Sequence, residues 1–230
     1  MNTTKNKITP FFIFISSFFI SSLIVSNIIA VKIVDIFGLI LPAAVIVFPI
    51  TYIFGDILTE VYGYKKARLV IWLGFFSNLI VVLFIKIAEI MPSASFWLKQ
   101  QAFSNILGYT PRILIASFTA YLIGEFLNSF VLSKIKLFTK GKFLWIRTIG
   151  STIAGQLVDS GMFITIAFIG SIPGEVLLKI IITQWLFKVI YETVATPFTY
   201  LVVNFLKKKE KVDSFDKNIN YNPLKIFDIQ

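Results

Sequence analysis

Four carboxylates lie inside long apolar stretches of this chain: Asp56, Glu125, Asp159 and Glu192. An acid at membrane depth costs roughly 2.5–3.5 kcal/mol on insertion scales, so each one is a functional-site hypothesis by default. Asp56 follows twenty uncharged residues, and Glu60 comes four residues later, so both would share one face of a helix. Such acids can accept hydrogen bonds from a polar ligand, pair with a ligand cation or carry a proton.

Other polar and aromatic residues accompany these acids in the apolar stretches. They could complete a polar ligand's hydrogen bonds or stack on its flat face. The candidates are Tyr52, Tyr121, Asn128, Gln156, Gln184, Trp185, Lys188 and Tyr191.

Several of these positions also have a structural interpretation. Lys188 and Glu192, four residues apart, can neutralise each other or join a network with the other acids. Glu60 precedes the basic residues Lys65, Lys66 and Arg68, which favours an interfacial ion pair over ligand contact. Amides inside apolar helices hold neighbouring helices together about as readily as they bind ligands. Arg112, like Trp and Tyr near helix ends, is most simply an anchor.

Composition places the chain in the membrane. Of 230 residues, 57% are hydrophobic and 25 are Phe, with a mean hydropathy of +0.83. A soluble domain could not bury that much apolar surface. The absence of Cys and His excludes disulfides, thiol nucleophiles, His-dependent triads and His or Cys metal sites. No phosphate-binding loop motif is present, so we do not expect the chain to hydrolyse ATP.

The apolar runs predict an all-α, polytopic membrane protein with six transmembrane helices. We expect residues 1–206 to form the membrane domain and 207–230 a loosely ordered, polar cytoplasmic tail. Pro49 should break the second helix and free backbone groups near Asp56, and Pro197 should kink the sixth. The expected helices are 8–31, 39–63, 68–90, 111–133, 148–170 and 175–206, with an interfacial segment at 91–110 and a basic loop at 134–147.

The basic residues predict the orientation. Sixteen of the 22 Lys and Arg residues fall on the side that holds both termini, and five fall on the other side. By the positive-inside rule both termini are cytoplasmic. This clustering between apolar runs also argues against a nucleic-acid partner, despite a net charge of +10. The expected partner is the lipid membrane.

A weak internal repeat connects two of the acids. Tyr52-x-x-Gly55-Asp56-x-Leu58 aligns with Tyr121-x-x-Gly124-Glu125-x-Leu127 at an offset of 69 residues. Both helices run towards the cytoplasm, so this would be a parallel duplication.

The motifs together resemble the signature of the queuosine precursor transporter family, also called the vitamin uptake transporter family. The resemblance covers about residues 31–203 and implies a six-helix inner-membrane importer of 7-deazaguanine precursors of queuosine. Six blocks carry it: Phe48-Pro49-x-Thr51-Tyr52-x-x-Gly55-Asp56-x-x-Thr59-Glu60-Val61-Tyr62-Gly63-Tyr64, Gly108-Tyr109-Thr110-Pro111-Arg112-Ile113, Ala116-Ser117, Tyr121-Leu122-x-Gly124-Glu125-x-x-Asn128, Gly155-Gln156-x-x-Asp159 and Lys188-x-x-Tyr191-Glu192-x-x-x-Thr196-Pro197.

The polar residues suit a deazapurine substrate. A 7-deazaguanine presents an N1–H beside an exocyclic amine, two donors that one carboxylate can accept together. Some precursors also carry an aminomethyl cation that a second carboxylate could pair. We expect Asp56, Glu125 and Asp159 to form the binding shell, completed by Asn128, Gln156 and Gln184, with Tyr52, Lys188 and Glu192 as further candidates. No catalytic residue, metal or cofactor is expected.

Three mechanisms stay open from the sequence. The leading one is a secondary transporter that works alone by alternating access, with a proton as a candidate coupling ion and a homo-oligomer not excluded. The second is the substrate-binding subunit of a vitamin ABC-type importer, against which the first helix argues, because it is rich in Ile, Phe and Ser and has only Ala30. The third is an intramembrane aspartyl protease, since Phe54-Gly55-Asp56 approaches the Gly-x-Gly-Asp motif but lacks its first Gly.

Overall fold

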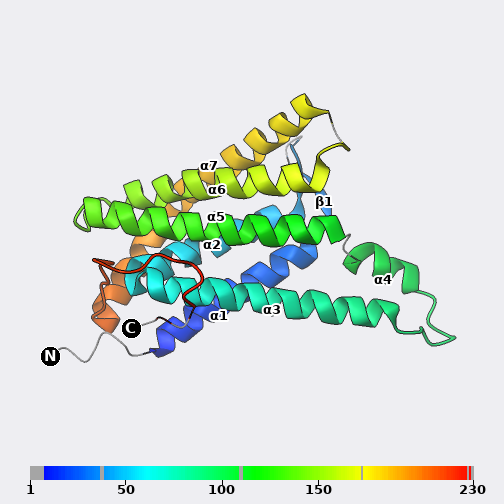
Figure 1. The fold of residues 1–230 in the computed structure, drawn as a ribbon, viewed down its shortest axis with the longest axis horizontal. Helices are drawn as coiled ribbons and strands as arrows, with labels where there is room; N and C mark the ends of the chain where they lie inside the picture. Colours follow the sequence, from blue (N-terminus) through cyan, green and yellow to red (C-terminus); the bar gives the residue numbers. More distant parts are fainter. Residues whose placement is uncertain (1–7, 37–38, 109–110, 172, 227, 229–230) are drawn as a thin grey trace.

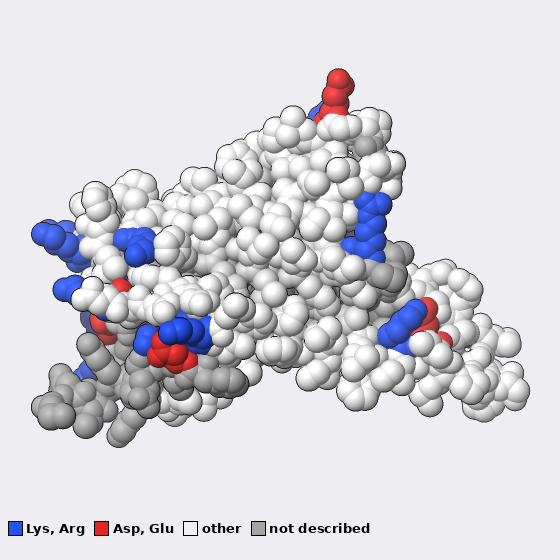
Figure 2. Space-filling view, in the orientation of Figure 1, with Lys and Arg blue, Asp and Glu red and all other residues white. Residues whose placement is uncertain are grey.

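The computed structural model describes residues 8–36, 39–108, 111–171, 173–226 and 228. Within these ranges six helical spans are long and apolar enough to cross a membrane, which confirms the expected all-α architecture. Charged side chains gather towards the ends of the bundle, and the band between them is uncharged on the visible face (Figure 2). A bundle with this charge distribution suits a bilayer, because charge in the hydrocarbon core is costly. The chain is therefore a multi-pass membrane protein.

The first span is followed by an element that the sequence analysis did not predict. Helix α1 covers Pro10–Ile29, and the side chain of Thr9 caps it by accepting from the Phe12 amide at 3.2 Å. Strands β1 (Ile33–Ile36) and β2 (Leu39–Pro42) then pair antiparallel, with Ile33 opposite Pro42. The prediction of helix from residue 39 onward was thus wrong at its start. β-Branched residues and a proline that cannot donate to a helix favour the hairpin.

The second span is discontinuous. A 3₁₀ turn at Ala43–Ile46 (η2) leads into helix α2 (Phe48–Ile57), and a π-helical turn at Leu58–Tyr62 (η3) ends the span. Pro49 lies in the first turn of α2, where its missing N–H leaves no intrahelical bond unmade. The break expected at Pro49 is therefore present as a helix start. Gly63 follows with a φ of +86°, a conformation that favours glycine.

The remaining helices are longer than the sequence analysis expected. The basic loop predicted at 134–147 shrinks to residues 139–143, because α5 and α6 each extend by a turn or more. Pro197 lies inside one continuous helix, α7. The bounds are Tyr64–Ile90 for α3, Gln100–Leu107 for α4, Pro111–Phe138 for α5, Leu144–Phe168 for α6 and Gly174–Glu210 for α7.

Glycines allow the helices to approach closely at the centre of the bundle. Helices α5 and α6 lie side by side, with α7 against α6 and α2 (Figure 1). A Cβ on Gly155 would come within 2.9 Å of the Gly124 carbonyl oxygen and 2.7 Å of the Asn128 Cβ. A Cβ on Gly55 would overlap a carboxylate oxygen of Glu125. Each of these glycines directly precedes a polar residue of the sequence-predicted site.

The chain after α7 is more ordered than predicted. It turns back at Lys211 and lies across the end of the bundle where α2 passes into α3 (Figure 1). Asp216 is buried, and its carboxylate accepts hydrogen bonds from the Tyr64 amide at 3.0 Å and the Ser133 hydroxyl at 2.5 Å. Although this segment is polar in sequence, its aspartates and carbonyl groups find donors on α3 and α5.

Candidate functional site

Eight of the nine sequence-predicted site residues come from four helices that converge near the centre of the bundle. We call them the polar cluster: Tyr52 and Asp56 on α2, Glu125 and Asn128 on α5, Gln156 and Asp159 on α6, and Lys188 and Glu192 on α7. All except Lys188 are buried, with exposed fractions of 5% or less. The sequence placed each residue in an apolar run; glycine contacts bring the runs of α2, α5 and α6 together, and Lys188 joins α7 to α6.

Asp56 is the centre of the α2–α5 contact. The Asn128 amide donates a 2.7 Å hydrogen bond to Asp56 Oδ1. Asp56 also lies close enough to Glu192 and Glu125 to interact with them electrostatically. Three residues after Asp56, the Thr59 hydroxyl lies 3.1 Å from the hydroxyl of Ser129 and continues the contact between the second span and α5. Asp56 therefore has one oxygen held by an amide and sits among other acids.

The second polar contact is an ion pair between α6 and α7. Lys188 Nζ lies 2.7 Å from Asp159 Oδ2 and 3.3 Å from Ser160 Oγ. The same ammonium lies 4.5 Å from the centre of the Phe48 ring, at the start of α2. The Phe48 ring in turn contacts the Tyr52 ring, with centroids 5.6 Å apart. A cation, a carboxylate and two aromatic rings thus meet beside the break in the second span.

The cluster has more buried acceptors than it has donors. Among the described residues, these side-chain oxygens have no hydrogen-bond partner: Tyr52 Oη, Asp56 Oδ2, both oxygens of Glu125, Asn128 Oδ1, Gln156 Oε1 and both oxygens of Glu192. A buried acceptor left unsatisfied typically costs about 1–3 kcal/mol, more if charged. This arrangement is suited to a ligand rich in N–H donors, or to protons carried on the acids.

The structure adds residues that the sequence analysis did not list as site candidates. Thr51 is buried, and its hydroxyl has no partner among the described side chains and backbone groups. Phe48 and Ser160 contact Lys188 directly. Both Phe48 and Thr51 stand in the motif around Asp56, so their membership of that motif was the available signal.

Gln184 is the one predicted residue that the structure does not join to the polar cluster. It lies on α7 one turn before Lys188 and is half-buried. Trp185 beside it donates to the Ile153 carbonyl at 3.0 Å and fastens α7 to α6. Arg112 caps the end of α6 by donating to the carbonyls of Ile166 and Ile169, as a helix-end anchor does.

Glu60 does form an ion pair, but with different partners from those expected. Arg147 holds both of its carboxylate oxygens, at 2.6 and 2.8 Å, and Lys207 approaches to 2.5 Å. Lys136 lies at 3.4 Å. The expected partners lie on α3 instead, where Lys65 pairs with Asp228 at 2.8 Å. Sequence proximity pointed to the wrong cations because the helix ends bring residues of α5, α6 and α7 to Glu60.

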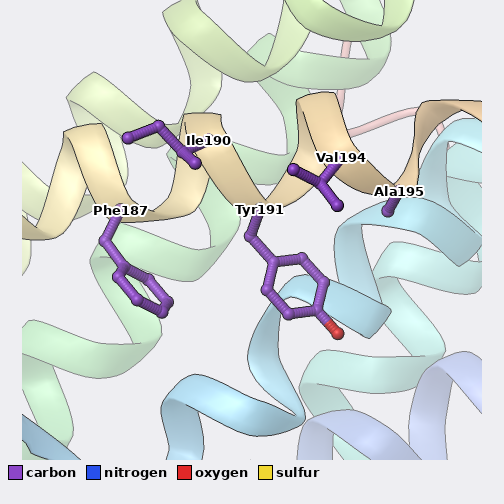
Figure 3. Close-up of a pocket in the computed structure, with 5 residues that line it drawn as sticks. All are labelled: Phe187, Ile190, Tyr191, Val194 and Ala195. Atoms are coloured by element: carbon purple, nitrogen blue, oxygen red, sulfur yellow. The ribbon is translucent and has the colours of Figure 1, made fainter. Parts of the chain in front are cut away.

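The groove drawn in Figure 3 does not coincide with the polar cluster. It has a volume of about 430 Å³ and is lined along α7 by Phe187, Ile190, Tyr191, Val194 and Ala195. Phe187 and Tyr191 extend from the same side of the helix (Figure 3). Since its lining is almost entirely apolar, this groove does not supply the hydrogen-bonding groups that the polar cluster holds.

Comparison with known proteins identifies relatives over most of the chain. The family model described as putative vitamin uptake transporter matches residues 42–202. A Bacillus subtilis (strain 168) protein named probable queuosine precursor transporter is 31% identical over 182 residues, which cover 79% of this chain and 80% of that protein. The Escherichia coli (strain K12) queuosine precursor transporter is 26% identical over 166 residues, 70% of this chain and 72% of that protein. A Haemophilus influenzae protein named probable queuosine precursor transporter is 28% identical over 121 residues, 53% and 49% of the two chains. No solved structure matches the chain.

Proposed function

This chain belongs to the putative vitamin uptake transporter family, and from that premise we propose that it imports queuosine precursors across the bacterial inner membrane. It is a multi-pass protein of that membrane, with relatives among bacterial transporters. The observation that carries the substrate class is the shared name of three relatives that span half or more of this chain. In this proposal the protein moves its substrate unchanged and is not an enzyme.

The polar cluster is the proposed substrate site. A queuosine precursor has a 7-deazaguanine ring, whose N1–H and exocyclic amine are adjacent donors. Glu125 offers two unpartnered oxygens, and Asp56 offers one. A carboxylate that accepts both donors fixes the plane of the ring. The amides of Asn128 and Gln156 supply an acceptor oxygen each, so the excess of acceptors in the cluster complements the donors of the ring.

The aromatic pair Phe48 and Tyr52 would supply the stacking surface. Base–aromatic stacking contributes about 1–3 kcal/mol per base, and it does so for any flat heterocycle. An aminomethyl group on the substrate would compete with Lys188 for Asp159, since both are primary ammonium groups. The site thus has separate groups for the ring edge, the ring face and a side-chain cation.

Transport would proceed by alternating access around this site. The broken second span places irregular backbone at membrane depth, a recurrent feature of transporter sites. We assign both chain ends and the basic end of the bundle to the cytoplasm, because most Lys and Arg residues lie there. The buried acids are the groups that a coupling proton would protonate.

Binding by the purified protein tests the proposal. Queuine and its aminomethyl and nitrile precursors would be titrated against detergent-solubilised protein by calorimetry. We expect at least one of them to bind, with affinity reduced tenfold or more by Glu125→Gln. The Gly161→Ala variant is the matched control, since nothing lies within 4 Å of a Cβ placed there. Absence of binding by folded protein for all three compounds would contradict the proposal.

A further inference from the structure

The segment after α7 closes the basic end of the bundle with polar contacts. We call residues 211–226 together with Asp228 the strap. Its Asp216 accepts from the Tyr64 amide, so the strap caps the first turn of α3 in place of the glycine that precedes that helix. The other oxygen of Asp216 lies against Gly63, where an added Cβ would be only 2.8 Å away. The strap therefore sits on the turn between η3 and α3.

A buried arginine depends on the strap for its partners. Arg68 has no exposed side-chain surface, and it donates to the carbonyl oxygens of Asn220, Asn222 and Asp228 at 3.1, 2.8 and 2.6 Å. A buried charge without partners is costly. The strap carbonyls replace the water that would otherwise solvate this guanidinium, so Arg68 holds the strap in one position.

The strap also completes the charge network around Glu60. Asp213 lies 2.6 Å from Lys136 Nζ and 3.0 Å from Lys207 Nζ, and both lysines contact Glu60. Together with Arg147 the network carries two negative and three positive charges. The network joins η3, α5, α6, α7 and the strap at one point, directly after the helix that carries Asp56.

These contacts have the character of a closure that can open. The strap is held by hydrogen bonds and ion pairs, and its Asp213 side chain is 43% exposed, whereas Arg68 and Asp216 are buried. Exposed ion pairs exchange with water at little cost. The π-helical turn beneath them is a type of irregularity frequently found at functional sites. A transporter needs one end of its site closed while the other is open.

We propose that the strap is a gate at the basic end of the bundle, closed in this structure, which must release Asp216 and Asp213 before substrate can leave the polar cluster. In the closed form the strap and the Glu60 network tie the ends of the helices together. In the open form the strap leaves the η3–α3 turn, and α2 becomes accessible from the same side. The gate itself is independent of which ligand the polar cluster takes.

The absence of native cysteines makes a reversible lock feasible. A Ser133→Cys plus Asp216→Cys variant, reconstituted in proteoliposomes, would be oxidised to tie the strap to α5. With queuine as probe, we expect at least a tenfold loss of uptake on oxidation and recovery on reduction, whereas uptake by each single-cysteine variant should not respond to oxidation. Uptake that persists in fully cross-linked protein would overturn the gate, and so would failure of the two thiols to join.

A second arm works even if queuine is not transported. Thr59 lies under the Glu60 network and is buried, so a Thr59→Cys variant reports access through the gate. We expect a membrane-impermeant maleimide added at the basic end to label it at least tenfold faster when Asp216→Ala is added. Lys217→Ala, an exposed strap substitution, is the control. Equal labelling of the Asp216→Ala and control proteins, both still monodisperse, would overturn the gate while leaving the transport proposal to its own test.

Discussion

Lys188 donates a 2.7 Å hydrogen bond to Asp159 while its ammonium lies 4.5 Å from the centre of the Phe48 ring. One cation thus connects α6, α7 and the start of α2. Both members of the pair are largely buried, with 14% and 7% of their side chains exposed. The pair holds the proposed site together and also occupies the place that a substrate ammonium would take.

Removing one partner of this ion pair should destabilise the fold more than removing both partners. Lys188→Met leaves Asp159 without its cation, and loss of one partner of a buried pair typically costs about 3–5 kcal/mol. Asp159→Asn combined with Lys188→Met removes both charges and should restore most of the loss. Thermal unfolding in detergent of the wild type, Lys188→Met, Asp159→Asn and the double variant measures the coupling between the two residues. Losses that simply add in the double variant would contradict an interaction between the two residues.

The glycine contacts predict a strong difference between two positions on α6. Gly155→Ala forces a Cβ against Asn128 and the Gly124 carbonyl, so the variant should be less stable by about 1–3 kcal/mol and should lose ligand affinity. Gly161→Ala meets nothing and should be neutral or more stable by up to about 1 kcal/mol, because alanine favours helix. The midpoint of thermal unfolding compares the two. Equal shifts would show that helix packing at Gly155 is looser than described.

The unpartnered acids should matter for binding more than for folding. Glu125→Gln and Glu192→Gln keep the side-chain shape but replace an acceptor oxygen with a donor. We expect at least tenfold weaker binding of queuine, with an unfolding midpoint equal to or above that of the wild type. If both variants bind as the wild type does, the acids serve packing and not recognition.

The strap should loosen in acid. Burial opposes ionisation of Asp213, but the hydrogen bond from Lys136 and the charges of Lys136 and Lys207 outweigh it and hold its pKa below the ordinary value. The stabilisation is therefore complete above the ordinary carboxyl pKa and is lost as the pH falls through the lowered one. The groups facing Asp213 are the two lysines and, behind them, Glu60.

Trp72 can report this change, since its indole N–H donates to the Pro223 carbonyl of the strap at 2.8 Å. In a variant with Trp72 as the only tryptophan, its fluorescence should be constant from about pH 5 to 8 and shift below that range. Adding Asp213→Asn should abolish or weaken the acid transition. A transition that is unchanged by this substitution would assign the pH response to another group.

The sequence predicted the parts of this protein that follow from burial in lipid. Long apolar runs predicted six spans, and Pro49 predicted the break that starts α2. The hairpin at β1 and β2 was missed because a short apolar stretch with β-branched residues reads equally well as helix. Helix α5 runs past its expected end because Lys134 and Lys136 looked like loop residues, whereas Lys134 is exposed on the helix and Lys136 is buried against Glu60 and Asp213.

The candidate site was predictable as a set of residues and not as a set of contacts. Acids at membrane depth stood out one by one, but the pairing of Asp159 with Lys188 and of Glu60 with Arg147 depends on how the helices cross. The order of the strap was not predictable from composition, because its stability comes from Arg68 and Ser133, far away in the sequence. Gln184 shows the limit of spacing alone, since an amide one helical turn before Lys188 lies outside the polar cluster.

The most direct test of the account is uptake of radiolabelled queuine and of the aminomethyl precursor by a host that lacks its own transporter and precursor synthesis. Wild type and Asp56→Asn would be compared at matched membrane levels, with Gly161→Ala as the control. We predict uptake by the wild type and the control, and at most a tenth of it for Asp56→Asn. No uptake by correctly inserted wild type would contradict the transport proposal, and equal uptake by Asp56→Asn would contradict the site.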